Sequence, residues 1–143
     1  MQSKEKKTIT VQAKINAPVA SVWKFWTTPE DIVHWNYASD DWQSPRAIND
    51  VREGGKFNIR METKDGSQGF DFAGEYNKVK TYRLIEYTIG DGRKVTIDFS
   101  GKGNTTRLVE TFEAENVYSV DQQRSGWQSI LNNFKKYAET TLH

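Results

Sequence analysis

The chain has 143 residues, which suits a single domain over residues 1–143 and is long enough to bury a core. It contains no cysteine, which excludes disulfides, thiolate catalysis and zinc–cysteine sites. Its 20 basic and 19 acidic residues are interspersed, so we expect no nucleic-acid partner and no attraction to an anionic membrane. No signal peptide and no apolar stretch of membrane-spanning length is visible, so we expect a cytoplasmic protein without a membrane partner.

The first third of the chain predicts one strand followed by two short helices. Apolar and polar residues alternate over residues 9–15, which is typical of a half-buried strand. Pro18 suits the first turn of a helix, and apolar residues then recur at helical spacing as far as Trp26. The run Thr28-Pro29-Glu30-Asp31 predicts a second helix start, with a capping hydroxyl, a proline and two acids near the positive end of the helix dipole.

The segment WNYASDDW, residues 35–42, follows this second helix. It places three large aromatic residues among short polar ones, with neither a helical nor a strand period. Such rings belong either to the core or to the rim of a pocket. We expect Trp35 in the core, and both interpretations stay open for Tyr37 and Trp42.

Residues 47–113 predict an antiparallel meander with one apolar face. Several segments alternate with a period of two, and turn signals at Asp65-Gly66, Asp91-Gly92 and residues 101–104 separate them. The large side chains that this period turns inward are Met61, Phe70, Phe72, Tyr76, Tyr87 and Phe99.

The chain closes with one long predicted helix over residues 119–141. Ser119 and Gln122 have capping-box spacing, and Trp127, Leu131 and Phe134 belong to its apolar stripe. A curved sheet must cover its apolar face, and only this helix is long enough to do so. The sequence therefore predicts an α+β fold, in which a curved antiparallel sheet of about six or seven strands wraps around a long C-terminal helix, with two short helices after the first strand.

This order of elements resembles the helix-grip fold of the START-like (SRPBCC) superfamily. The opening NAPVASVWKFWTTPEDIVHW, residues 16–35, is similar to the start of that superfamily. Four later segments resemble the AHSA-type branch, related to the activator of the Hsp90-type chaperone ATPase: GGKFNIRME at 54–62, GFDFAGEY at 69–76, TRLVETFEAE at 106–115 and QRSGWQSILNNFKKYAE at 123–139. The resemblance implies a cavity for a hydrophobic small molecule in many members, and chaperone binding in the eukaryotic activators, usually alongside a second domain.

A small hydrophobic or aromatic molecule is therefore the expected partner, bound between the sheet and the final helix. Each inward ring by itself is better explained as core. Together, however, the rings beyond the reach of the helix must contact each other, the short helices or a ligand. The candidate ligand-binding residues are Trp35, Tyr37, Trp42, Met61, Phe70, Phe72, Tyr76, Tyr87, Phe99, Glu110 and Trp127.

Glu110 is the most informative polar residue of this set. Leu108 and Phe112 flank it at a spacing of two, so a regular strand turns all three side chains inward. A buried carboxylate finds a partner or stays protonated. Glu110 therefore contacts a ligand or acts as an acid or base, or else an internal ion pair with an arginine or a strand bulge satisfies it. Tyr87, Trp127 and an inward arginine are the candidate partners, and Arg60 is less suitable because it shares the outward face.

The remaining motifs give little support for catalysis. His34 has no Cys, Asp or His partner at motif spacing, and His143 is the last residue. No metal-binding set, phosphate loop or nucleophile elbow is present, so we assign no catalytic residue, no metal ligand and no cofactor. Gly126 in the final helix indicates either close packing against another backbone, which we expect, or room for a ligand. The alternatives to ligand binding are a co-chaperone that acts through its surface and a cyclase- or hydrolase-type enzyme.

Overall fold

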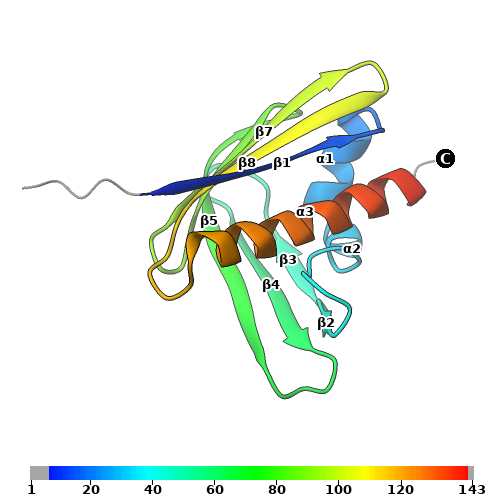
Figure 1. Ribbon diagram of the computed structural model, residues 1–143. Coiled ribbons are helices and arrows are strands. Elements are labelled where there is room, and N and C mark those ends of the chain that lie inside the picture. The colour runs from blue at the N-terminus through cyan, green and yellow to red at the C-terminus, as the bar shows by residue number, and fades with distance from the viewer. Residues whose placement is uncertain (1–6, 142–143) are drawn as a thin grey trace, which may run out of the picture.

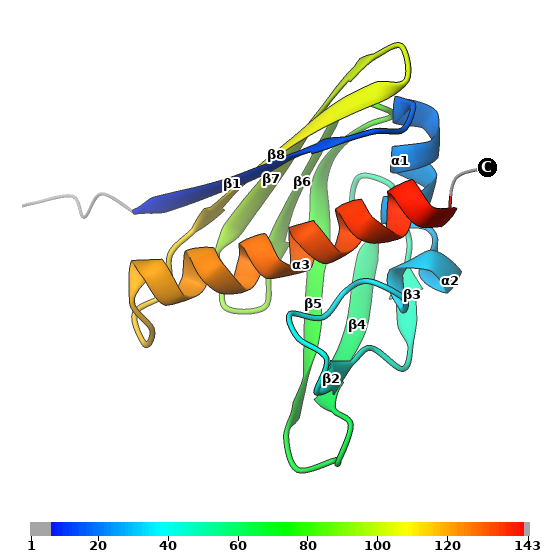
Figure 2. The same ribbon diagram turned by 45° about the vertical axis from the view of Figure 1, so that its right-hand side comes forward.

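A curled antiparallel sheet wraps around one long helix in the computed structural model, which describes residues 7–141 (Figures 1 and 2). His143 lies outside the described residues. The elements in chain order are β1 (Thr8–Ile15), α1 (Val19–Thr27), α2 (Pro29–Ile32), β2 (Trp42–Gln43), β3 (Ala47–Asn49), β4 (Lys56–Thr63), β5 (Gly69–Lys80), β6 (Leu84–Ile89), β7 (Lys94–Lys102), β8 (Thr105–Glu113) and α3 (Val120–Thr141).

The sheet has eight strands in the order β1-β8-β7-β6-β5-β4-β2, and β3 also pairs with β4. The predicted α+β helix-grip fold is confirmed, including both short helices after β1. The strand number exceeds the expected six or seven because β2 and β3 have only two and three residues. A strand that short shows no period of two in the sequence.

The predicted turns join β4 to β5, β6 to β7 and β7 to β8. Gly66, Gly92 and Gly103 have positive φ angles there, which residues with a Cβ adopt only at a cost. The long β8 pairs with β1 and β7, and its inward residues from Thr106 to Phe112 are buried at every second position. Glu110 is one of these buried residues.

The α3 helix begins with the predicted capping box. The Gln122 backbone N–H donates to Ser119 Oγ at 3.1 Å, and the Ser119 backbone N–H donates to Gln122 Oε1 at 3.1 Å. Leu131 and Phe134 are fully buried, so the second half of α3 supplies the core contact of the helix. By contrast, the expected capping hydroxyl of Thr28 is wrong, since this side chain makes no capping hydrogen bond to α2.

Polar side chains of α3 bind the free edge of β1. Gln128 Nε2 donates to the Gln12 carbonyl at 3.1 Å, and Lys135 Nζ donates to the Lys14 carbonyl at 2.7 Å. The Asn16 backbone N–H donates to the Glu139 carboxylate at 2.8 Å. These contacts occupy main-chain groups that an edge strand would otherwise offer to another strand.

Trp35 joins the short helices to α3. Its ring lies 4.8 Å from the Trp26 ring and 4.8 Å from the Phe134 ring, and its indole N–H donates to the Phe25 carbonyl at 3.0 Å. The side chain is 3% exposed, so the expected core position of Trp35 is confirmed. These rings close one end of the space between the sheet and α3.

Candidate functional site

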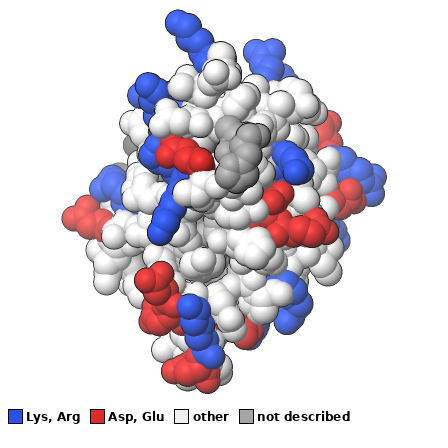
Figure 3. Space-filling view, turned by 90° about the vertical axis from the view of Figure 1, so that its right-hand side faces the viewer, with Lys and Arg blue, Asp and Glu red and all other residues white. Residues whose placement is uncertain are grey.

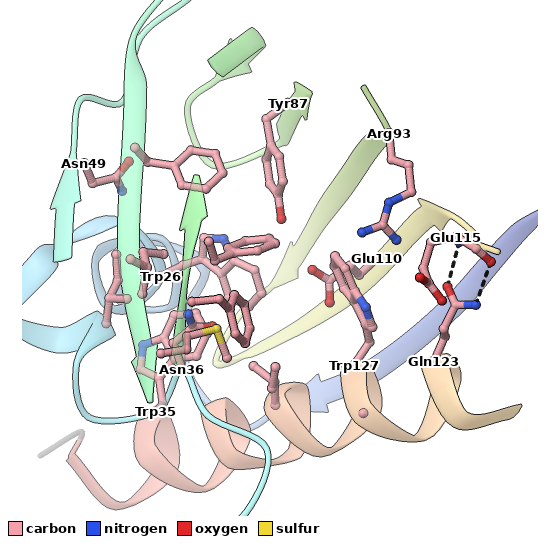
Figure 4. A pocket seen from close by; sticks show the side chains of 18 of the residues that line it. Trp26, Trp35, Asn36, Asn49, Tyr87, Arg93, Glu110, Glu115, Gln123 and Trp127 are labelled. Atoms are coloured by element: carbon pink, nitrogen blue, oxygen red, sulfur yellow. Dashed lines mark hydrogen bonds between the residues drawn. The ribbon is translucent and has the colours of Figure 1, made fainter. Parts of the chain in front are cut away.

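A cavity of about 480 Å³ lies between the inner face of the sheet and the first half of α3 (Figure 4). Aromatic and aliphatic side chains form most of its wall. The sheet residues of this wall lie on β3, β4, β5, β6 and β8. From α3, the wall is closed by Gln122, Gln123, Gly126, Trp127 and Ile130. The exposed side chains of Phe70 and Tyr118 lie at its borders.

Most of the residues predicted from the sequence line this cavity. They are Trp35, Met61, Phe70, Phe72, Tyr76, Tyr87, Glu110 and Trp127. The regular alternation of the strands explains the six strand residues of this set, because it turns alternate side chains toward α3.

Tyr37, Trp42 and Phe99 do not belong to this lining. The Tyr37 hydroxyl donates to the His34 carbonyl at 3.2 Å, and Trp42 packs edge-on against Phe70 with the ring centroids 6.0 Å apart. Phe99 lies 5.0 Å from the Trp23 ring, in the core beneath α1. The short helices fill the end of the sheet near Phe99, so its side chain meets other rings rather than the open space.

Other lining residues were not singled out from the sequence. Phe57 and Ile59 share the period of two with Met61, so the alternation of β4 already contained their signal. Arg93 and Glu115 lie in connections outside the regular strands, where no period indicates direction. Only the folded chain brings them to the cavity.

Glu110 places a carboxyl group in this apolar space. Its side chain is 5% exposed and points into the cavity (Figure 4). Within residues 7–141 it has neither a hydrogen bond nor an ion pair, so the expected alternative of an internal arginine pair is wrong. Arg60 instead pairs with Glu62 at 3.1 Å and with Asp71 at 3.6 Å on the outer face. Burial raises the pKa of Glu110 to about 8, which keeps the carboxyl protonated at neutral pH.

Two buried tyrosines of the lining differ in their hydroxyl groups. The Tyr76 hydroxyl donates to Asn49 Oδ1, whereas the Tyr87 hydroxyl points into the cavity and has no hydrogen-bond partner among the described residues. Burial, and then the nearby Glu110, raise the pKa of Tyr87 well above its usual value. Tyr87 and Glu110 therefore both offer hydrogen-bonding capacity to whatever enters the cavity.

The β8–α3 connection forms one border of the cavity, and Gln123 holds it in place. Gln123 Nε2 donates to the carbonyls of Glu115 and Tyr118 at 3.1 and 2.9 Å, and its Oε1 accepts the Glu115 backbone N–H at 2.9 Å (Figure 4). Arg93, in the connection between β6 and β7, also lines the cavity, and its Nε lies 2.8 Å from the Asp91 carboxylate. No other guanidinium of the described part of the chain lines the cavity, and that of Arg93 is already paired with Asp91.

Gly126 corrects a prediction from the sequence. The predicted close packing against another backbone is wrong, because a Cβ added at Gly126 would meet nothing within 4 Å. The glycine lines the cavity, so the missing side chain leaves room rather than allowing close contact.

The described residues give no cluster of three or more His, Asp or Glu side chains that could hold a metal ion. His34 is exposed and stacks on Tyr137, with the ring centroids 5.8 Å apart. Basic and acidic side chains are interspersed on the face shown in Figure 3. Among residues 7–141, no helix combines the length and the hydropathy that crossing a bilayer requires.

Comparison with known proteins agrees with this architecture. A family model described as "Activator of Hsp90 ATPase homolog 1-like protein" matches residues 16–139. The comparison with curated proteins gave no match.

Solved structures extend the likeness to nearly the whole chain. An AHSA1-like protein from Aeromonas hydrophila is 38% identical over 94% of each chain, with a TM-score of 0.89. A protein from Cytophaga hutchinsonii is 50% identical over 94% of this chain and 93% of that one, with a TM-score of 0.80. A protein from Nitrosomonas europaea shares the fold, with a TM-score of 0.79, at 16% identity over 94% of this chain and 95% of that one.

Proposed function

Because the chain belongs to the family of Activator of Hsp90 ATPase homolog 1-like proteins, we propose that it binds a small hydrophobic or aromatic molecule in the cavity between the sheet and α3. Trp35, Met61, Phe70, Phe72, Tyr76, Tyr87, Glu110 and Trp127 would contact this molecule. In this proposal Tyr37, Trp42 and Phe99 support the surrounding fold.

The unfilled space beside Gly126 carries this proposal. Protein interiors are normally packed as closely as organic crystals, and an empty apolar space costs stability. Here a helix that covers the sheet has a glycine where a side chain would fill part of the space. A volume of about 480 Å³ with mostly apolar walls and few polar groups is typical of small-molecule sites.

The walls favour a ligand with a ring or a broad apolar body. The Phe57 ring lies 5.6 Å from Phe72 and 4.9 Å from Tyr87, and Phe72 lies 6.1 Å from Trp127. Rings at such distances offer both edges and faces to a planar guest. Selectivity would then come from shape and from the few polar groups, chiefly Glu110 and Tyr87.

The test is a variant that fills the cavity, compared with a matched variant that does not. Gly126→Leu places a side chain in the space, whereas Ser125→Leu adds the same side chain at the neighbouring exposed position. N-phenylnaphthylamine, a neutral apolar dye that fluoresces when bound, serves as the probe. We expect Gly126→Leu to weaken its binding by about tenfold or more, and Ser125→Leu to leave binding close to that of the parent.

Equal binding of the dye to both variants would contradict the proposal, provided that circular dichroism shows both to be folded. The thermal unfolding temperature gives a second measurement. A ligand that binds only the folded state raises it by an amount that grows with the ratio of ligand concentration to Kd, and this rise should disappear in Gly126→Leu.

A co-chaperone role is the second candidate, and the description of the family supports it. The exposed Val117 and Tyr118 on the β8–α3 connection offer an apolar contact on the surface. Such a role would appear as a change in the ATPase rate of an Hsp90-type chaperone. Gly126→Leu should then leave that change intact, because the substitution alters the interior and not this connection.

A further inference from the structure

We propose that the cavity selects a ligand with a positively charged amine on an apolar body, and that Glu110 is the counter-ion of that amine. This inference rests on the proposed ligand-binding function and names the chemical class of the ligand. It follows from a buried carboxyl group that points into the cavity without a partner, from the charges around it and from the rings beside it.

Among residues 7–141, no basic side chain forms an ion pair with Glu110. Its neighbours across the sheet are Val11 on β1 and Ile97 on β7, both apolar. The lining side of α3 presents Gln123, Gly126 and Trp127, none of which is charged. An ammonium group would therefore supply the one partner that this carboxyl lacks.

The titratable groups farther along the wall favour a cation over an anion. Tyr87 on β6 contributes a neutral phenol, and Glu115 after β8 contributes a second carboxyl group. Among residues 7–141, Arg93 is the only cationic side chain of the lining, and its Nε already lies 2.8 Å from the Asp91 carboxylate. A carboxylate ligand would be repelled by the two acids, and the one arginine is already paired with Asp91. An amine could instead form an ion pair with Glu110.

Aromatic rings next to Glu110 add a second reason. Phe72 lies 6.2 Å from the Tyr87 ring and 6.1 Å from the Trp127 ring, so three rings form one wall. Trp127 stacks one face on Phe112 at 3.9 Å and lines the cavity with the remainder of its indole. Ring faces attract cations, most strongly when water is excluded. An ammonium group at Glu110 would thus have both a carboxylate and ring faces within the same site.

The binding of an amine should release a proton. Burial raises the pKa of Glu110 to about 8, so at pH 7 the carboxyl holds its proton while an alkylamine in solution is charged. The ion pair forms only when the carboxyl proton leaves to the buffer, so about one proton is released for each amine bound. Linkage then makes the affinity rise by about tenfold for each pH unit below the pKa of Glu110 and level off above it.

Three probes of one skeleton test the inference: phenylbutylamine, phenylbutanol and phenylbutyrate, which are cationic, neutral and anionic. Calorimetric titration at pH 7 in phosphate and in Tris reports the protons exchanged, because the two buffers differ in their heat of protonation. We expect the amine at pH 8 to bind about tenfold or more tightly than the alcohol, and the butyrate to bind most weakly. At pH 7 only the amine should release about one proton.

Glu110→Gln should remove both the preference for the amine over phenylbutanol and the proton release. Glu86→Gln is the control, because it removes one negative charge from β6 at a position outside the cavity lining. The proton release by the parent protein needs no variant, so it decides the question even where Glu110→Gln does not fold.

The outcomes separate this inference from the function on which it rests. Equal or tighter binding of phenylbutanol or phenylbutyrate, or binding of the amine without proton release, overturns the choice of an amine and leaves a hydrophobic-ligand site intact. Failure of all three probes and of N-phenylnaphthylamine to bind overturns both proposals.

Discussion

The indole of Trp127 lies flat on the ring of Phe112, with the ring centroids 3.9 Å apart and the planes inclined by 12°. Phe112 is fully buried on β8, two residues beyond Glu110, while Trp127 lies on α3 and lines the cavity. This stacked pair therefore joins the helix to the sheet, and its Trp127 member also forms part of the cavity wall. A change at Trp127 should affect both stability and binding.

Trp127→Ala should lower the free energy of unfolding by about 2 kcal/mol or more, because truncation of a packed aromatic residue removes apolar contacts and leaves a void. It should also weaken binding of N-phenylnaphthylamine. Urea unfolding and dye titration measure the two effects. Arg124→Ala, an exposed change one turn earlier, is the control and should change neither by a comparable amount. If Trp127→Ala keeps the stability and the dye affinity of the parent, the stacked pair contributes neither to folding nor to binding.

Leu131→Ala should cost about 2–5 kcal/mol, as expected for a fully buried leucine. Leu131 belongs to the stripe of α3 that packs on the sheet, and its loss leaves a cavity that the surrounding rings cannot fill. Asn132→Ala, at the next and exposed position, should change stability only slightly. A loss below about half a kcal/mol for Leu131→Ala would contradict the assignment of this stripe, because it lies far below the usual range.

The stability of the protein should fall as pH rises from about 5 to about 8. Burial raises the pKa of Glu110 from 4.5 to about 8, so the folded state binds a proton that the unfolded state has released in this window. Each pH unit contributes about 1.4 kcal/mol, and the whole window contributes at most about 5 kcal/mol. The stabilising contribution of the Glu110 proton is therefore at its maximum below pH 4.5 and is absent above pH 8.

Glu110→Gln isolates this contribution. Glutamine resembles the protonated carboxyl, so the variant should be close to the parent in stability at pH 5 and more stable than the parent at pH 9. Urea unfolding at several pH values measures the difference, with Glu86→Gln as the control that retains the slope of the parent. Two parallel stability curves for Glu110→Gln and the parent would rule out Glu110 as the titrating group.

Gly126→Ala should raise the free energy of unfolding by about 1 kcal/mol, the difference in helix propensity between the two residues. The added methyl group meets nothing within 4 Å, so no clash opposes this gain. Ser125→Ala on the exposed side of the same turn should give a gain of roughly half that size or less. Destabilisation by Gly126→Ala would mean that the helix approaches another backbone there, as the sequence had suggested.

Local periodicity was sufficient to predict the fold and part of the cavity wall. Alternation over residues 105–113 turned Glu110 inward between Leu108 and Phe112, and the structure buries all three. The stripe of α3 and its capping box likewise follow from spacing within one turn or two. Such predictions succeed because the side of an element that faces the core repeats with the geometry of that element.

Tertiary structure decided whatever depends on a partner from a distant part of the chain. The alternation of β8 predicts that Glu110 points inward, but it does not say whether an arginine pairs with it. In the structure the carboxyl group is unpaired among the described residues and lies in an apolar cavity. The sequence singled out Gly126 as unusual in a helix, but only the packing of the helix on the sheet shows that open space lies beside it. Arg93 reaches the cavity from a connection without any period. A sequence therefore determines the direction in which a side chain points, because that depends on its own strand or helix, whereas the group that it meets depends on how separate elements pack together.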